Sequence, residues 1–219
     1  MIEDFFAGVE HRWPTGRADL HWHVLFPPEL VEERLVAPYR GITHRPGLAP
    51  VEARWLHTTV MHGGPVAEYS TDEIDTIVDR VRQECQAVAP IDLTFDRPSP
   101  GRVAVECAAR PGALGRRLWE LTTRVDREVT GSRFPLIPKR WYPHASLAYG
   151  VAGPERADRQ IMKVLLSDHP GAPVVLRADT ISLVAQSHDR QQITWEHLAD
   201  VRLGGCLTSD GGSVRQGRG

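Results

Sequence analysis

Two histidines, His57 and His144, each stand two residues before a hydroxyl side chain. The first precedes Thr59 in the segment Trp-Leu-His-Thr-Thr-Val-Met, and the second precedes Ser146 in Tyr-Pro-His-Ala-Ser-Leu-Ala. In a β-strand, side chains at positions i and i+2 point to the same face. Each pair therefore combines an imidazole that moves protons near neutral pH with a hydroxyl that can donate a hydrogen bond to a phosphate oxygen.

Two such strands side by side would hold a phosphoryl group between two imidazoles and two hydroxyls. In-line attack at phosphorus needs a base at the entering oxygen and an acid at the leaving oxygen, on opposite sides. Two histidines can fill both roles without a metal, and either one can be the acid. The spacing alone is not specific, since a chain with 10 histidines should contain roughly one His-x-Thr/Ser triplet by chance. The alternative explanation is a pair of half-buried structural histidines bonded to the backbone.

Strand alternation adds neighbours to each histidine. Counting by twos places Trp55 and Met61 on the face of the first histidine, and Arg140 and Tyr142 on the face of the second. An arginine there would neutralise a phosphate, and an aromatic ring would stack on a base. The ordinary alternatives are a solvated arginine and an aromatic ring that belongs to the core.

Two further histidines share one face of a third predicted strand, residues 20–26. These are His21 and His23, and we expect His23 to lie in the cleft as a substrate-binding residue. A His-x-His pair can also bind a metal ion, but no Asp, Glu or Cys at suitable spacing completes such a site. The sequence therefore predicts no metal and no other cofactor. The remaining six histidines are expected at the surface: His11, His44, His62, His169, His188 and His197.

The composition is that of an ordinary soluble globular protein. The chain has 219 residues, of which 41% are hydrophobic and 25% charged, enough for one domain made of two lobes. A net charge of -2 excludes the broad basic field of a protein that coats duplex DNA. The three cysteines are far apart, and the acidic start MIEDFFAGVE has no signal-peptide features. We therefore expect a cytoplasmic protein without a membrane partner.

Hydrophobic periodicity and turn residues predict interleaved helices and strands without a regular βαβ rhythm. Ser70 and Glu73 form a capping box before a helix that runs to Cys85, and Gly131 is placed to end another helix. The predicted strands are residues 20–26, 55–61, 91–95, 102–108, 140–149, 174–176, 181–186 and 193–201. The other predicted helices are residues 29–37, 114–129 and 156–166, and residues 38–52 are expected to be a loop.

Each half of the chain contains helices, strands and one His-x-Thr/Ser strand, which suggests two similar lobes that face each other. We expect residues 1–19 to be an N-terminal segment and residues 20–203 to form the single bilobal domain. Residues 204–219 are rich in glycine and are expected to form a disordered tail.

The two motifs resemble those of the 2H phosphoesterase superfamily, in particular its branch of 2′-5′ RNA ligases and RNA 2′,3′-cyclic phosphodiesterases. Pro143 directly before the second histidine, and Leu147 and Ala148 after the second hydroxyl, agree with the second motif of that family. One feature departs from it: Tyr149 and Gly150 follow the second motif, where many members carry an arginine.

The resemblance implies an α+β fold with two related lobes of mainly antiparallel sheet, flanked by helices, around a central cleft. It also implies that His57 and His144 are the acid/base pair, that Thr59 and Ser146 bind phosphate, and that no metal is required. The expected function is then a phosphodiesterase for 2′,3′-cyclic phosphates or 2′-5′ linkages, whose partner is a nucleotide or an RNA terminus. We expect a monomer.

Two other functions fit the same residues. The first is a nucleotide- or RNA-end-binding module that uses the same pocket without catalysis. The second is a metallohydrolase built on the His-x-His pair of the third strand, whose activity a chelator would abolish and a divalent ion restore.

Overall fold

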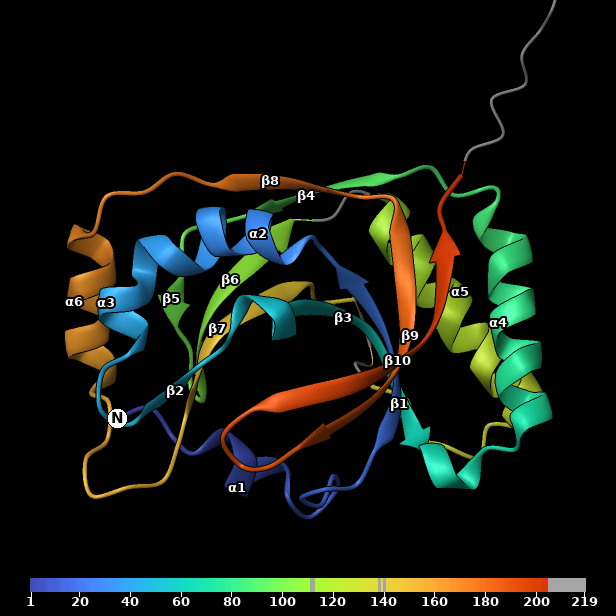
Figure 1. Ribbon diagram of the computed structural model, residues 1–219, viewed down its shortest axis with the longest axis horizontal. Coiled ribbons are helices and arrows are strands. Elements are labelled where there is room, and N and C mark those ends of the chain that lie inside the picture. The colour runs from blue at the N-terminus through green and yellow to red at the C-terminus, as the bar shows by residue number, and fades with distance from the viewer. Residues whose placement is uncertain (111–112, 138, 140, 205–219) are drawn as a thin grey trace, which may run out of the picture.

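The computed structural model describes residues 1–110, 113–137, 139 and 141–204 (Figure 1). Its strands are β1 (Asp19–Leu25), β2 (Leu48–Pro50), β3 (His57–Pro65), β4 (Ile91–Phe95), β5 (Ser99–Pro100), β6 (Ala104–Arg110), β7 (His144–Gly150), β8 (Val174–Ala178), β9 (Thr180–His188) and β10 (Ile193–Arg202). The α-helices are α1 (Phe5–Val9), α2 (Pro28–Val31), α3 (Arg40–Thr43), α4 (Thr71–Cys85), α5 (Ala113–Thr130) and α6 (Arg159–Asp168).

The strands form two antiparallel sheets. One has four strands in the order β10-β9-β1-β3, and the other has six, in the order β2-β7-β6-β4-β8 with β5 paired to β6. Helices α4 and α5 pack on each other and contact β10 and β3, whereas α6 contacts β5 (Figure 1). The expected α+β fold with two lobes is confirmed.

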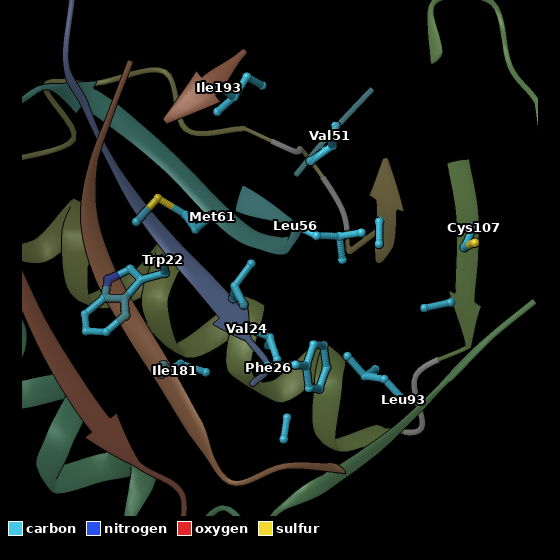
Figure 2. Packing of buried hydrophobic residues seen from close by; sticks show 14 of the residues in the cluster. Trp22, Val24, Phe26, Val51, Leu56, Met61, Leu93, Cys107, Ile181 and Ile193 are labelled. Carbon is cyan, nitrogen blue, oxygen red and sulfur yellow. The ribbon is translucent and has the colours of Figure 1, made fainter. Parts of the chain in front are cut away.

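A continuous hydrophobic core joins the two sheets. Trp22 and Met61, from neighbouring strands of the four-stranded sheet, are fully buried. Leu93 and Cys107 contribute from the six-stranded sheet, and Figure 2 shows Phe26 between the two groups. The burial of these large apolar side chains is the main driving force that holds the two lobes together.

The capping box and the helix stop are confirmed. Ser70 accepts a hydrogen bond from the backbone N–H of Glu73, the Glu73 carboxylate accepts one from the N–H of Ser70, and α4 follows. Gly131 directly after α5 has φ 64°, a left-handed conformation that favours glycine. Among the described residues, no helix is long and apolar enough to cross a bilayer.

The expected loop at 38–52 is wrong in part. Residues 28–43 form a nearly continuous run in which α2 leads through a π-turn (Glu32–Val36) and a 3₁₀-turn (Ala37–Tyr39) into α3. Pro38 lies in the first turn of the 3₁₀ segment, where a missing N–H is tolerated. Strand β2 then pairs with β7.

Candidate functional site

Both motif histidines begin a strand, and both line one cavity of about 180 Å³ between the sheets. His57 begins β3, at the edge of the four-stranded sheet, and His144 begins β7, inside the six-stranded sheet. At the cavity, the backbone of His62 on β3 pairs with that of Ile137, which lies in the segment between α5 and β7. The N–H of His62 donates to the Ile137 carbonyl at 2.6 Å, and the N–H of Ile137 donates back at 3.0 Å.

The two imidazoles are oriented by the same local hydrogen bond. Nδ1 of His57 lies 2.9 Å from the carbonyl oxygen of Trp55, and Nδ1 of His144 lies 3.0 Å from that of Tyr142. A carbonyl can only accept, so Nδ1 of each ring carries the hydrogen. The neutral ring then keeps its lone pair on Nε2, which is the atom free to exchange a proton within the cavity.

An extra residue breaks the alternation of β3 directly after its hydroxyl. Thr59 pairs with His23, and Met61 pairs with Trp22, so that Val60 has no partner on β1. Such a bulge inverts the faces of the residues that follow. Met61, which we expected beside the first histidine, is consequently buried in the core.

The same kind of bulge occurs on β7. Ser146 pairs with Glu106, and Ala148 pairs with Val105, so that Leu147 has no partner on β6. Each histidine motif is therefore followed by a one-residue bulge at the same position.

These two bulges bring additional side chains to the site. The residue five positions after each motif histidine, His62 on β3 and Tyr149 on β7, lines the cavity together with Thr59 and Ser146. Burial raises the pKa of the Tyr149 phenol to about 12, against the effect of its hydrogen bond with Ser146. Tyr149 is thus a neutral hydroxyl next to the motif serine.

Imidazole rings form two stacked pairs at the cavity. His23 stacks on His57 with ring centroids 4.2 Å apart, and His21 stacks on His62 at 3.9 Å. Trp195 closes the first stack with its ring 5.1 Å from that of His57. His23 is fully buried and is not among the side chains that line the cavity, so it lies behind the first motif histidine instead of facing a substrate.

Burial controls the protonation of this stack. It lowers the pKa of His57 to about 4, the hydrogen bond to Trp55 opposes the shift, and the charge of His144 adds to it. Burial also lowers the pKa values of His21 and His23 well below the usual range, and the neighbouring histidines lower them further. All three rings are therefore neutral at pH 7.

Two histidines expected at the surface lie inside. His62 binds Asp19 through Nε2 at 2.9 Å, and Asp19 also accepts from Arg17 at 2.7 Å. Although burial acts to raise the pKa of Asp19, the hydrogen bonds from His62 and Arg17 hold it below its usual range. His188 is buried and bonds through Nε2 to the carbonyl of Trp13 at 2.9 Å. Their sequence neighbourhoods carry no signal for these roles, because the partners are distant in the chain.

The three other predicted site residues have different positions. Tyr142 is 52% exposed, lines the cavity, and donates a hydrogen bond to Glu106 at 3.2 Å. Trp55 lies in a 3₁₀-turn (Ala53–Trp55), where it packs against Trp195 at 4.9 Å and does not line the cavity. Arg140 lies outside the described residues.

The His-x-His pair is not arranged as a metal site. Within the described part of the chain, no three His, Cys, Asp or Glu side chains are placed to hold a metal ion. The rings of His21 and His23 meet edge to face at 5.3 Å, and each stacks on another histidine. Their donor nitrogens therefore do not converge on one point.

Comparison with known proteins identifies the family. Residues 26–190 match the model of the 2′-5′ RNA ligase superfamily, and this match covers most of the chain and includes both motifs. The chain belongs to this superfamily of 2H phosphoesterases. No curated protein sequence matches this superfamily member significantly.

Several solved structures have the same fold. TT0787 of Thermus thermophilus is similar with a TM-score of 0.63 and 20% identity, over 85% of this chain and 98% of that one. Escherichia coli LigT, in a complex with 3′-AMP, is similar with a TM-score of 0.60 and 17% identity, over 86% of this chain and 99% of LigT. Further LigT structures contain NADP+ or ATP. At such identities these similarities establish the fold alone.

Proposed function

We propose that this superfamily member is a metal-independent phosphodiesterase that acts on 2′,3′-cyclic phosphates or 2′-5′ linkages of nucleotides or RNA ends. The observation that carries the proposal is the shared cavity in which His57 and His144, held alike through Nδ1, stand beside Thr59 and Ser146. Two imidazoles with free Nε2 atoms are the groups that in-line displacement at phosphorus requires.

His57 is assigned as the base and His144 as the acid. With a pKa of about 4, His57 is neutral at pH 7 and can accept a proton. For a 2′,3′-cyclic phosphate, His57 takes a proton from the attacking water while the oxygen of that water bonds to phosphorus. The bond from phosphorus to one ribose oxygen breaks, and His144 protonates that oxygen. The product is a phosphate monoester with an adjacent hydroxyl.

The two motif hydroxyls are assigned to the non-bridging phosphate oxygens. Thr59 is partly exposed, and Ser146 is nearly buried, so both can donate hydrogen bonds to a ligand within the cavity. Preorganised donors at oxygens that gain charge stabilise the transition state more than the ground state. The nucleotide complexes of LigT, including that with 3′-AMP, support a nucleotide as the ligand class.

The test is turnover of adenosine 2′,3′-cyclic monophosphate by His57→Ala and His144→Ala. Loss of a general acid or base costs about 10²- to 10⁴-fold in kcat. The matched control is His44→Ala, because His44 is an exposed histidine that also bonds through Nδ1 to a backbone carbonyl, that of Arg40, at 3.0 Å. We expect the control to keep wild-type turnover.

Three outcomes would contradict the proposal. Wild-type turnover by either motif variant would exclude the two-histidine mechanism. Loss of turnover in chelator, restored by a divalent ion, would indicate a metallohydrolase. Saturable binding of the nucleotide without any product would identify a non-catalytic binding module.

A further inference from the structure

The N-terminal segment, defined here as residues 1–18, is built into the fold ahead of the residues that match the superfamily model. Ile2, Phe6 and Trp13 are each at most 3% exposed and belong to the hydrophobic core. The N–H of Ile2 donates to the carbonyl of Ala157 at 2.8 Å, and the N–H of Glu3 donates to that of Arg102 at 2.8 Å. The segment is therefore a fixed part of the molecule.

This segment contacts both sheets at the cavity. Phe5 packs on Tyr149 of the six-stranded sheet with ring centroids 4.6 Å apart. Trp13 packs on the four-stranded sheet, 5.8 Å from the ring of His62 and 4.6 Å from that of His188. In Figure 1, α1 lies between the ends of β1 and β7. Phe5, Val9, Arg12 and Trp13 all line the cavity, so the segment forms one of its walls.

Arg12 is the one cavity-lining side chain among the described residues that carries a permanent charge. Its backbone is fixed, because its N–H donates to the carbonyl of Val9 at 3.0 Å and its own carbonyl accepts from Arg17 at 2.5 Å. Its side chain is exposed, and within the described part of the chain no hydrogen bond or ion pair engages the guanidinium. A fixed backbone with an uncommitted guanidinium is suited to a ligand anion.

The cavity beside this wall also has unpaired polar atoms. Nε2 of His21 and Oε1 of Gln186 have no hydrogen-bond partner among the described residues, although both residues are at most 3% exposed and line the cavity. Nδ1 of His21 is 3.2 Å from Nε2 of Gln186. Buried polar atoms without a partner are unfavourable unless water or a ligand completes them. The ring of Trp13, on the wall, lies 5.8 Å from that of His21.

We propose that Arg12 binds a phosphate group of the substrate, so that the N-terminal segment supplies the permanent positive charge of the phosphodiesterase site. The inference rests on the proposed function, because it assumes a phosphate ligand in this cavity. A phosphodiester is an anion, and apart from Arg12 no described side chain that lines the cavity carries a permanent positive charge to balance it. Arg12 precedes residues 26–190, so this contribution comes from outside the part of the chain that matches the family.

The experiment compares Arg12→Gln with Arg12→Lys and with the matched control Arg45→Gln. Arg45 is exposed, does not line the cavity, and has no side-chain bond within the described residues. Dissociation constants are measured by calorimetry for inorganic phosphate and for adenosine 3′-monophosphate. KM and kcat are measured for adenosine 2′,3′-cyclic phosphate with and without a 5′-phosphate.

We expect Arg12→Gln to weaken binding of adenosine 3′-monophosphate and to raise KM about tenfold or more, with Arg12→Lys between it and the wild type. The control should match the wild type. If Arg12→Gln weakens the binding of both substrates and of inorganic phosphate alike, Arg12 binds the reacting phosphate. If it weakens only the binding of the 5′-phosphorylated substrate, Arg12 binds a second phosphate. Both results support the inference.

The inference would be overturned if Arg12→Gln and Arg45→Gln had equal dissociation constants and equal KM values for every ligand. It would also be overturned if the wild-type protein bound neither inorganic phosphate nor adenosine 3′-monophosphate. The two proposals fail separately. A wild-type protein that turns over the cyclic phosphate, with Arg12→Gln unchanged, refutes the role of Arg12 alone. A wild-type protein that binds adenosine 3′-monophosphate through Arg12 but never turns over a cyclic phosphate refutes the catalytic proposal alone.

Discussion

At the scale of single residues, the burial of His57 determines how activity depends on pH. A base must be deprotonated to act, and its pKa of about 4 keeps His57 deprotonated through the neutral range. We expect kcat/KM for a 2′,3′-cyclic nucleotide to stay level as the pH falls from 7 to about 5, and to decline only as the pH approaches 4. The measurement is a pH profile in which each sample is also returned to pH 7 and assayed again, to exclude unfolding. An acidic limb near pH 6.5 would contradict the assignment of His57.

The exposed ring of Tyr142 is predicted to stack on the base of the substrate. A stacked base contributes about 1–3 kcal/mol, so Tyr142→Ala should raise KM for adenosine 2′,3′-cyclic phosphate by about fivefold or more. Tyr142→Phe keeps the ring and loses only the hydrogen bond to Glu106, and it should behave as the wild type. Ribose 2′,3′-cyclic phosphate, which has no base, is the control substrate. An equal effect of Tyr142→Ala on both substrates would show that the ring does not contact the base.

At the scale of elements, Gly150 determines how closely the N-terminal segment approaches β7. A Cβ atom at Gly150 would lie 2.2 Å from the backbone carbonyl oxygen of Glu3, so the segment must shift. We expect Gly150→Ala to lower the free energy of unfolding by about 1–3 kcal/mol, as in overpacked interiors. The measurement is urea unfolding. Gly41→Ala is the matched control, because a Cβ there meets nothing within 4 Å, and equal stabilities of the two variants would refute the prediction.

Elements with a local signal were predicted from the sequence, and those that depend on a distant partner were not. The capping box of Ser70 and Glu73 identified the start of α4, since both partners lie within one turn. The bulges at Val60 and Leu147 have no such local signal in the sequence, because an apolar residue is equally common at paired and at unpaired positions of a buried strand. The motif pairs keep their phase because each bulge comes after the hydroxyl. The faces of the positions directly after each bulge are inverted, and for that reason His62 and Tyr149 were missed.

At the scale of the whole molecule, three histidines with lowered pKa values couple folding to pH. The pKa values of His21, His23 and His57 are lowered in the folded protein, whereas in the unfolded chain each titrates near 6.5. Below pH 6.5 the unfolded chain binds protons that the folded protein does not. The contribution of these histidines to the free energy of unfolding is therefore fully present above pH 6.5 and is lost as the pH falls below it, by up to about 1.4 kcal/mol per pH unit for each histidine.

We expect a marked fall in the free energy of unfolding between pH 7.5 and pH 5.5, measured in urea. His23→Phe keeps an aromatic ring in the stack but removes one titrating group, so its stability should fall less over the same interval. A slope identical to that of the wild type would show that His23 is already protonated in the folded protein, or never protonated in the unfolded one.

The two-lobe architecture was predictable because its signal is distributed over the whole chain. Each half has its own helices, strands and motif, and averaging over many residues makes the pattern robust. The wall formed by the N-terminal segment was missed. Ile2, Phe6, Val9 and Trp13 are all buried, and their spacing of four, three and four residues is that of a helical stripe, a signal that could have indicated a segment packed on the domain.

The matching motifs of β3 and β7 have a consequence for the direction of the proposed reaction. Each strand brings one histidine and one hydroxyl to the cavity, from opposite sheets. In the transition state of an in-line displacement, the entering and leaving oxygens are equivalent ends. A histidine at each end can accept a proton in one direction of the reaction and donate it in the other. Microscopic reversibility then lets the same groups make a phosphodiester as well as break it, and the concentrations of water and of the competing hydroxyl decide which reaction is observed.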